Sequence, residues 1–204
     1  MNQIRSICVY CGSSNGRGED YVNAGRTLGR SIAEANMRLV YGGGTRGIMG
    51  AVARGTIEAG GKVTGIIPRF LINKEAAQSA LGELDDVVVT EDMHTRKHKM
   101  FEESDAFVAL PGGIGTLEEV VEIMTWGQLG RHHKPIAFVN INGFWDPMLA
   151  LLDHMRAEGF VHTGHLVQPL VIDTAEAVVP AIIKQATAFA EKAAQGDLRT
   201  IERL

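Results

Sequence analysis

The chain has 204 residues, of which 45% are hydrophobic and 22% charged, and its formal charge is −4. This length and composition fit one globular domain, and so mild a charge gives no electrostatic reason to expect nucleic acid or an anionic membrane as the main partner. No apolar run approaches the ~20 residues of a bilayer span, and the stretch Ile7–Tyr10 is too short for a signal-peptide core, so we expect a cytoplasmic location.

Short β-branched runs alternate with longer helical patterns along the chain, which is typical of a parallel sheet covered by helices. The elements predicted in chain order are strand Ile4–Tyr10, helix Asp20–Asn36, strand Arg38–Tyr41, helix Ile48–Ala59, strand Lys62–Ile67, strand Val87–Thr90, helix Met93–Glu103, strand Ala106–Leu110, helix Leu117–Leu129, strand Pro135–Asn140, helix Asp146–Ala157, edge strand Pro169–Ile172 and helix Ala175–Ala194. We interpret Arg69–Asp86 as a surface excursion that shapes or covers a pocket. The fold class is therefore α/β, with one domain over residues 1–194 and a loose tail over 195–204.

Two glycine clusters, Tyr41–Gly50 and Leu110–Glu119, each follow a strand and precede a helix. In a doubly wound sheet such turns lie at the carboxyl ends of the strands, where ligands bind. Glycine lets backbone N–H groups approach an anion, and the helix N-terminus adds unpaired donors. The alternative is that these glycines only make tight turns.

Neither cluster has a known nucleotide fingerprint. The segment Pro111–Thr116 lacks the Lys-Ser/Thr ending of a triphosphate-binding loop, and Cys11–Ser14 does not read G-x-G-x-x-G. The sequence therefore favours a monophosphate, with no metal and no cofactor required.

The second cluster leads into three acidic residues: Glu118, Glu119 and Glu122. A carboxylate in the first turn of the predicted helix would lie beside whatever the glycine turn holds. Glu118 and Glu119 diverge by about 100° and cannot face one atom, whereas Glu122 lies near the side of Glu119. Acids favour any first helical turn, but a role on sugar hydroxyls or water would also explain them.

The densest basic stretch is Met93–Met100. Arg96 offers a planar fork suited to phosphate or carboxylate, and Lys97 a point charge. His94 and His98 have the i, i+4 spacing of a metal pair, but no third ligand accompanies them, so we predict no metal site. The alternative for the whole stretch is a solvated helix face.

Cys8 and Cys11 form a lone C-x-x-C. A zinc site would need a second ligand pair, and a redox pair would open a helix rather than lie in a strand. We expect two reduced, buried thiols.

Taken together, these motifs resemble the LONELY GUY (LOG) family of cytokinin riboside 5′-monophosphate phosphoribohydrolases, long labelled as lysine decarboxylases. The residues that carry the resemblance are P-G-G-I-G-T-L-E-E (111–119), M-H-T-R-K (93–97), the early G-S-S (12–14), G-G-G-T-R-G-I-M-G (42–50), I-P-R (67–69), S-D-A (104–106) and T-W-G-Q-L-G (125–130). The segment Arg69–Leu84 departs from the plant pattern, since Phe70 and Leu71 follow Arg69, so the resemblance does not fix the preferred base.

The resemblance implies a Rossmann-like fold, a homodimer with higher assembly open, and hydrolysis of an N6-modified AMP to free base and ribose 5-phosphate. It assigns catalysis to Arg96 and Glu119. Together with the clusters and acids above, the expected substrate- and phosphate-binding positions are Ser13, Gly43, Gly44, Arg96, Lys97, Gly112, Gly113, Ile114, Gly115, Thr116, Glu118, Glu122 and Thr125.

Three alternative functions can be weighed against this hydrolase prediction. Lysine decarboxylation would need a pyridoxal phosphate lysine, and no lysine here has a context that singles it out. A hydrolase acting on unmodified AMP would use the same residues. A non-enzymatic carrier of molybdenum cofactor could use the same glycine turn, but it has no need of Arg96 with Glu119.

Overall fold

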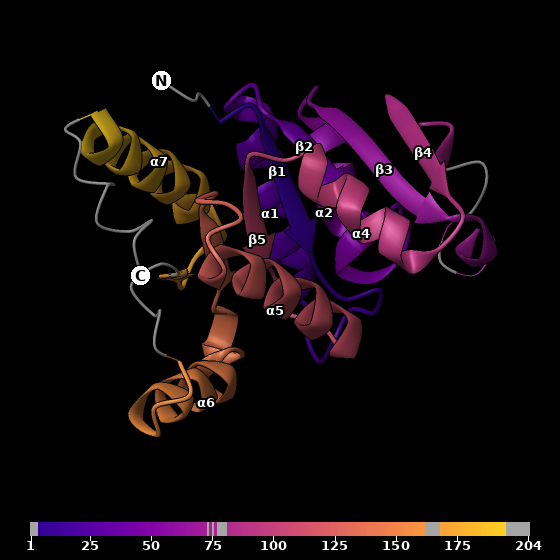
Figure 1. Ribbon diagram of the computed structural model, residues 1–204. Helices are drawn as coiled ribbons and strands as arrows, with labels where there is room; N and C mark the ends of the chain where they lie inside the picture. Colours follow the sequence, from indigo (N-terminus) through magenta and orange to yellow (C-terminus); the bar gives the residue numbers. More distant parts are fainter. Residues whose placement is uncertain (1–3, 73, 75, 77–80, 162–167, 195–204) are drawn as a thin grey trace.

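The computed structural model describes residues 4–72, 74, 76, 81–161 and 168–194 (Figure 1). The strands are β1 (Ser6–Tyr10), β2 (Arg38–Tyr41), β3 (Lys62–Pro68), β4 (Asp86–Thr90), β5 (Ala106–Ala109), β6 (Ile136–Val139) and β7 (Leu170–Ile172). The α-helices within these residues are α1 (Asp20–Glu34), α2 (Gly47–Glu58), α4 (Met93–Glu102), α5 (Ile114–Gln128), α6 (Asp146–Ala157) and α7 (Val178–Ala194). Short 3-10 turns are η1 (Arg69–Leu71), η2 (Ile141–Gly143) and η3 (Ala175–Ala177).

The strands form one parallel sheet in the order β4-β3-β2-β1-β5-β6-β7. The chain runs outward from β1 to β4 on one side and then returns to place β5 against the other side of β1. This reversal is the topological switch point of a doubly wound fold, and ligands of such folds bind outside the carboxyl ends of the strands on either side of it. The predicted Rossmann-like α/β fold is confirmed.

Helices cover both faces of the sheet, as the alternation along β1 requires. Ile7 and Val9 belong to a core cluster with residues of α1, α2 and α7, whereas Cys8 and Tyr10 belong to a second cluster with residues of α4 and α5. Successive strand residues point to opposite faces, so one buried strand supplies both cores. Figure 1 shows α4 and α5 lying together on one face of the sheet.

The predicted elements exist in the predicted order, with three corrections. Helix α5 begins at Ile114, three residues before the predicted start, so the second glycine cluster is partly helical. Strand β3 includes Pro68, which pairs with Thr90, whereas the predicted strand ended at Ile67. The excursion after β3 is not wholly superficial, because Leu81 packs with Ile67 in a small third core.

The division into residues 1–194 and a tail stays a prediction, and the tail 195–204 lies outside the described residues. None of the helices in the described ranges combines the length and the apolar composition that crossing a bilayer requires.

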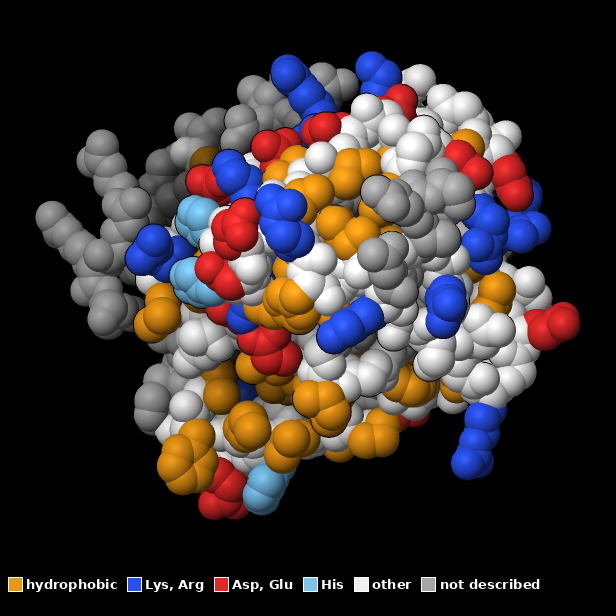
Figure 2. Space-filling model, turned by 90° about the vertical axis from the view of Figure 1, so that its right-hand side faces the viewer, with side chains coloured by type: hydrophobic (Ala, Val, Ile, Leu, Met, Phe, Trp, Pro, Cys, Tyr) orange, Lys and Arg blue, Asp and Glu red, His pale blue; other side chains and the backbone are white. Residues whose placement is uncertain are grey.

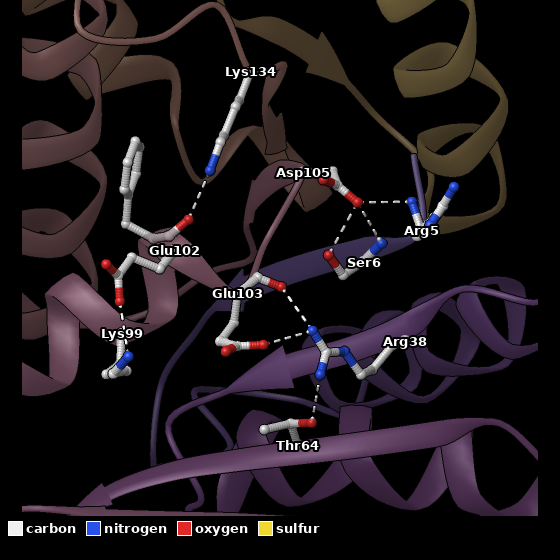
Figure 3. Close-up of polar contacts among 10 residues, drawn as sticks. Arg5, Ser6, Arg38, Thr64, Lys99, Glu102, Glu103, Asp105 and Lys134 are labelled. Atoms are coloured by element: carbon white, nitrogen blue, oxygen red, sulfur yellow. Dashed lines mark hydrogen bonds and ion pairs between the residues drawn. The ribbon is translucent and has the colours of Figure 1, made fainter. Parts of the chain in front are cut away.

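Polar side chains tie the strands together at the amino edge of the sheet (Figure 3). Asp105, just before β5, accepts hydrogen bonds from the backbone N–H groups of Arg5 and Ser6 at 2.8 and 3.1 Å. Arg38 at the start of β2 donates to the Glu103 carboxylate at 2.8 Å. These charges are engaged in holding the fold, at the edge opposite the glycine turns.

Candidate active site

Three turns meet at the carboxyl edge of the sheet, beside the switch point. The turn after β1 packs on the turn after β5, since Gly12 donates its N–H to the Pro111 carbonyl at 3.1 Å. A Cβ on Gly12 would lie 3.3 Å from Gly112 Cα, so the two backbones are in contact. The turn after β2 lies on the other side of the β1 turn.

The first glycine cluster, after β2, is closed by the protein's own backbone. Ile48 and Met49, in the first turn of α2, donate their N–H groups to the carbonyls of Ser14 and Gly12 at 3.4 and 3.2 Å. Gly43 has a φ of +75° and is buried against Ile67. Tight turning and close packing therefore account for glycine at this cluster. A nucleotide contact at Gly43 or at the neighbouring buried Gly44 stays a prediction.

The second glycine cluster presents an open helix N-terminus. Gly113 is the N-cap of α5, and within the described residues no acceptor is bonded to the N–H groups of Ile114, Gly115 and Thr116. Gly113 and Gly115 are exposed, and the Ile114 side chain is 82% exposed. Unpaired N–H groups and the positive end of the helix dipole make this turn suited to an anion.

Glycine is needed beside this helix start because Thr116 folds back over it. A Cβ on Gly112 would lie 2.1 Å from Thr116 Oγ1, closer than any real contact. Thr116 itself is 3% exposed. The predicted residues 112–116 thus form one continuous surface at the start of α5.

Arg96 and Glu119 come together at the same edge, on neighbouring helices. Arg96 Nη1 lies 4.0 Å from Glu119 Oε1, and their side chains are 4% and 8% exposed. The guanidinium also donates from Nε to the Ile66 carbonyl and from Nη2 to the Gly42 carbonyl, both at 3.2 Å. Arg96 is therefore fixed over the ends of β2 and β3 with one nitrogen turned toward Glu119.

Glu119 lies deeper in α5 than the sequence suggested. It is the sixth residue of the helix and not part of the first turn, in which the structure has no acidic residue. It shares the buried face of α5 with Thr116, three residues earlier, whereas Glu118 points to the surface. A ligand held at the helix start would therefore have Glu119 beside it, one turn along.

The Lys97 ammonium group forms ion pairs with Glu118 and Glu122. Its ammonium contacts Glu118, and it lies 3.2 Å from Glu122 Oε1. Partial burial alone would lower the pKa of Lys97, but its hydrogen bonds to Glu118 and Glu122 outweigh that effect and the pKa is raised. Glu118 and Glu122, four residues apart, share the Lys97 side of the helix, and the expected position of Glu122 near the side of Glu119 stays a prediction. Phosphate binding by Lys97 stays a prediction and would require Lys97 to leave these partners.

Positive charge is not concentrated on this side of the molecule. Figure 2, which looks onto the right-hand side of Figure 1, shows acidic and basic side chains interleaved above an area rich in hydrophobic ones. An anion here would be held by local donors and not by a broad positive field.

Two other predicted contacts, Ser13 and Thr125, are exposed, unlike the buried Arg96–Glu119 pair. Ser13 is exposed in the turn after β1. Thr125 is exposed on α5, where its hydroxyl donates to the Val121 carbonyl at 2.8 Å. Thr125 follows Ile114 by eleven residues, which is about 16 Å along the helix axis. Its predicted role cannot involve the phosphate at its own helix start.

The histidine pair and the cysteine pair form neither a metal site nor a disulfide among the described residues. His98 lies 3.2 Å from Glu102 on α4, and no cluster of metal ligands occurs in the part of the chain that the structure describes. Cys8 and Cys11 are free and buried, as predicted, and burial raises the pKa of both thiols.

Sequence reasoning missed three contributions to the site. Met93 places its sulfur 3.7 Å from Arg96 Nη1. Asp92 caps α4 by accepting the Thr95 N–H at 2.7 Å, which lowers the pKa of its carboxyl. Trp145 donates from its indole to the Ala109 carbonyl at the end of β5. Asp before a basic helix is a readable capping signal, but no spacing rule reveals the other two.

Comparison with known proteins identifies relatives of this chain. Residues 49–182 match the family model described as possible lysine decarboxylase. The chain is 44% identical to cytokinin riboside 5′-monophosphate phosphoribohydrolase LOG3 of Arabidopsis thaliana, over 78% of this chain and 73% of the relative. It is 45% identical to LOG of Oryza sativa subsp. japonica, over 78% of this chain and 65% of the relative.

Solved structures share the fold at low sequence identity. The molybdenum cofactor carrier protein of Chlamydomonas reinhardtii superposes with a TM-score of 0.66 at 20% identity, over 91% of this chain and 99% of that one. The molybdenum cofactor binding protein of Rippkaea orientalis gives 0.64 at 21%, over 89% and 97%.

The fold and site define a Rossmann-like α/β protein with an open helix N-terminus beside a buried arginine–glutamate pair. The chain shares 44–45% sequence identity with the LOG relatives but only 20–21% with the molybdenum cofactor proteins. The chain belongs to the LOG family of cytokinin riboside 5′-monophosphate phosphoribohydrolases.

Proposed function

We propose that this protein hydrolyses the N-glycosidic bond of a cytokinin riboside 5′-monophosphate, an N6-modified AMP, to free base and ribose 5-phosphate. The observation that carries the proposal is the Arg96–Glu119 pair, 4.0 Å apart and buried beside the open start of α5. Relatives at 44–45% identity carry the name of this activity.

The 5′-phosphate would bind the N–H groups at the start of α5. The helix dipole contributes about 0.3–1 kcal/mol at an exposed site, so the converging N–H groups supply most of the affinity. Binding energy gained at the phosphate, which does not react, orients the ribose toward Glu119. Because the phosphate stays attached to the sugar, the product ribose 5-phosphate would bind the same turn.

Glu119 would act on the sugar. Breaking the bond between C1′ and the base nitrogen leaves positive charge on the ribose, as in glycoside hydrolysis. The Glu119 carboxylate would stabilise that charge, bind ribose hydroxyls and orient the attacking water. The water oxygen bonds to C1′, the electron pair of the broken bond goes to the base, and a water proton is released to neutralise it.

Arg96 would position the reacting groups. Its Nε and Nη2 atoms are bonded to backbone carbonyls, so Nη1, next to Glu119, is the nitrogen turned toward the reaction. A fixed guanidinium can hold the Glu119 carboxylate in one orientation and meet negative charge on the ligand without rearranging.

The test is incubation of the protein with N6-isopentenyl-AMP and with AMP, followed by chromatography for free base. We expect base release from the N6-modified nucleotide and kcat about 10²–10⁴-fold lower in the matched variant Glu119→Gln, with an unchanged circular dichroism spectrum. Absence of any base release would refute the proposal. A variant within threefold of the wild type would remove Glu119 from the mechanism.

The same assay separates the two alternatives. Equal kcat/KM for AMP and its N6-modified form would indicate a general AMP hydrolase. Binding without turnover would indicate a carrier. The carriers' likeness concerns the fold alone, at 20–21% identity.

We also propose a homodimer and a cytoplasmic location. Helix α6 has no buried residue, and its Leu151 and Met155 are 47% and 37% exposed. Val171 on the edge strand β7 is 48% exposed, and a groove of about 510 Å³ lies between α6 and β7. An apolar face of this kind marks an interaction surface. Light scattering should give twice the chain mass for the wild type and a lower mass for Leu151→Glu, and assembly beyond the dimer would appear in the same measurement.

A further inference from the structure

The loop between β6 and α6 reaches the glycine turn through one tryptophan. Trp145 is 4% exposed, and its indole Nε1 donates to the Ala109 carbonyl at 3.2 Å. Ala109 is the last residue of β5, and Pro111 and Gly112 follow two and three residues later. The indole therefore binds the strand at the point where it leaves the sheet to form the turn.

Trp145 is itself held in place on several sides. Its backbone N–H donates to Asn140 Oδ1 at 2.8 Å, and the Asn140 side-chain amide donates to Asp146 Oδ1 at 2.8 Å. Its ring lies 5.0 Å from the rings of both Phe138 and Phe144. A side chain with these contacts has few rotamers available, so its N–H is a fixed point.

The turn has a second anchor on the β1 side. Gly12 donates to the Pro111 carbonyl at 3.1 Å, and Leu110 donates to the Tyr10 carbonyl at 3.0 Å. Backbone hydrogen bonds to the β1 side and the Trp145 indole hydrogen bond on the β6 side therefore both hold the turn. Donors at a helix start bind an anion well only when their positions are fixed before it arrives.

We propose that Trp145 is a positioning residue for the phosphate-binding turn. Its indole N–H fixes the Ala109 carbonyl, and with it the path of residues 110–113 and the direction of the N–H groups at the start of α5. This inference rests on the proposed function, because it concerns the affinity of that turn for the 5′-phosphate. Trp145 does not touch the substrate.

Calorimetric titration with ribose 5-phosphate tests the proposal. Trp145→Phe keeps an aromatic ring and removes the donor, and we expect its Kd to rise about tenfold, which is 1.4 kcal/mol. The matched control is Phe107→Leu, a buried change on the same strand that leaves the indole bond intact. It should lower Tm while its Kd stays within twofold of the wild type.

Equal Kd values for Trp145→Phe and wild type would overturn the positioning role, and so would an equal rise in both variants. Failure of the wild type to bind ribose 5-phosphate would instead overturn the proposed phosphate site, and the positioning role with it.

A second experiment, by NMR, needs no substitution at Trp145. The chain has two tryptophans, so ¹⁵N-labelled protein gives two indole N–H signals, which Trp126→Phe assigns. Because the indole bond forms before the ligand binds, the Trp145 indole N–H should exchange slowly with deuterium in the ligand-free protein, and fast exchange would contradict the proposal.

Discussion

Replacing Gly42 by alanine should displace the Arg96 guanidinium without replacing either residue that is proposed to act in catalysis. A Cβ at this position would lie 1.9 Å from Arg96 Nη2 and 3.1 Å from its Cζ. Real Cβ contacts essentially never fall below 3.0 Å, so the guanidinium must retreat by more than an ångström. The group that moves is the end of a flexible side chain and not backbone, so the fold should survive.

The size of the effect follows from the hydrogen bond that breaks and from the shift of the guanidinium. The Nη2 bond to the Gly42 carbonyl is a charged hydrogen bond, worth about 1.5–3 kcal/mol. A misplacement of about 1 Å in a catalytic arrangement costs about 10²-fold in rate. Reduced entropy of the unfolded chain returns about 0.4–1 kcal/mol to an alanine variant. We expect kcat/KM to fall about 100-fold and the unfolding free energy to fall by about 1–2 kcal/mol.

A double-mutant cycle shows whether Arg96 transmits the effect. Gly42→Ala is made in the wild type and in the Arg96→Lys variant, and both pairs are compared by base release and by urea unfolding. Lysine has no guanidinium group, so the new methyl group has no Nη2 atom to clash with in the second background. The alanine should cost much less in the second background, with a coupling energy of about 1.5 kcal/mol or more. Additive effects, or activity within threefold of the wild type, would show that displacement of Arg96 is not the cause.

Three further predictions concern titrating groups. The pKa of Lys97 is raised in the folded protein, so its stabilising contribution is complete below the unfolded value of about 10.4 and is lost as pH rises through the folded value. The difference in unfolding free energy between wild type and Lys97→Met should therefore stay constant from pH 7 to 9 and shrink above about pH 10.5. Burial lowers the pKa of His132, so the unfolded chain takes up a proton first as pH falls. Stability should then decline from pH 7 to 5 in the wild type, and His132→Gln should decline less, by up to about 1.4 kcal/mol per pH unit; parallel curves would exclude His132. Because burial raises the pKa of both thiols, Cys8 and Cys11 should react with Ellman's reagent about 100-fold slower in native protein than in guanidinium chloride, and a fast native reaction would contradict their burial.

The order of elements could be predicted because each strand is a short apolar run bounded by glycine, proline or polar residues. The start of α5 could not. Ile114, Gly115 and Thr116 follow two glycines, and glycine disfavours helix by about 1 kcal/mol. Packing of Thr116 against Gly112 and burial of the helix face beyond it outweigh that local preference.

The sequence supplied candidate site residues but not the contacts that these residues make in the fold. The resemblance supplied Arg96 and Glu119, while the fold brings them within 4.0 Å from separate helices. The ion pairs of Lys97 also join two helices, so no spacing rule along one helix reveals them. Gly42 reads as one of three adjacent glycines, and only the structure distinguishes it by its contact with Arg96.

The most direct test of the proposed substrate site is a crystal structure of the Glu119→Gln variant with an N6-modified AMP bound. We predict the phosphate within hydrogen-bond distance of the N–H groups of Ile114, Gly115 and Thr116, and the ribose C1′ beside residue 119 and Arg96. A nucleotide with its phosphate at the turn after β2, or seated between α6 and β7, would contradict the assignment of phosphate binding to the start of α5.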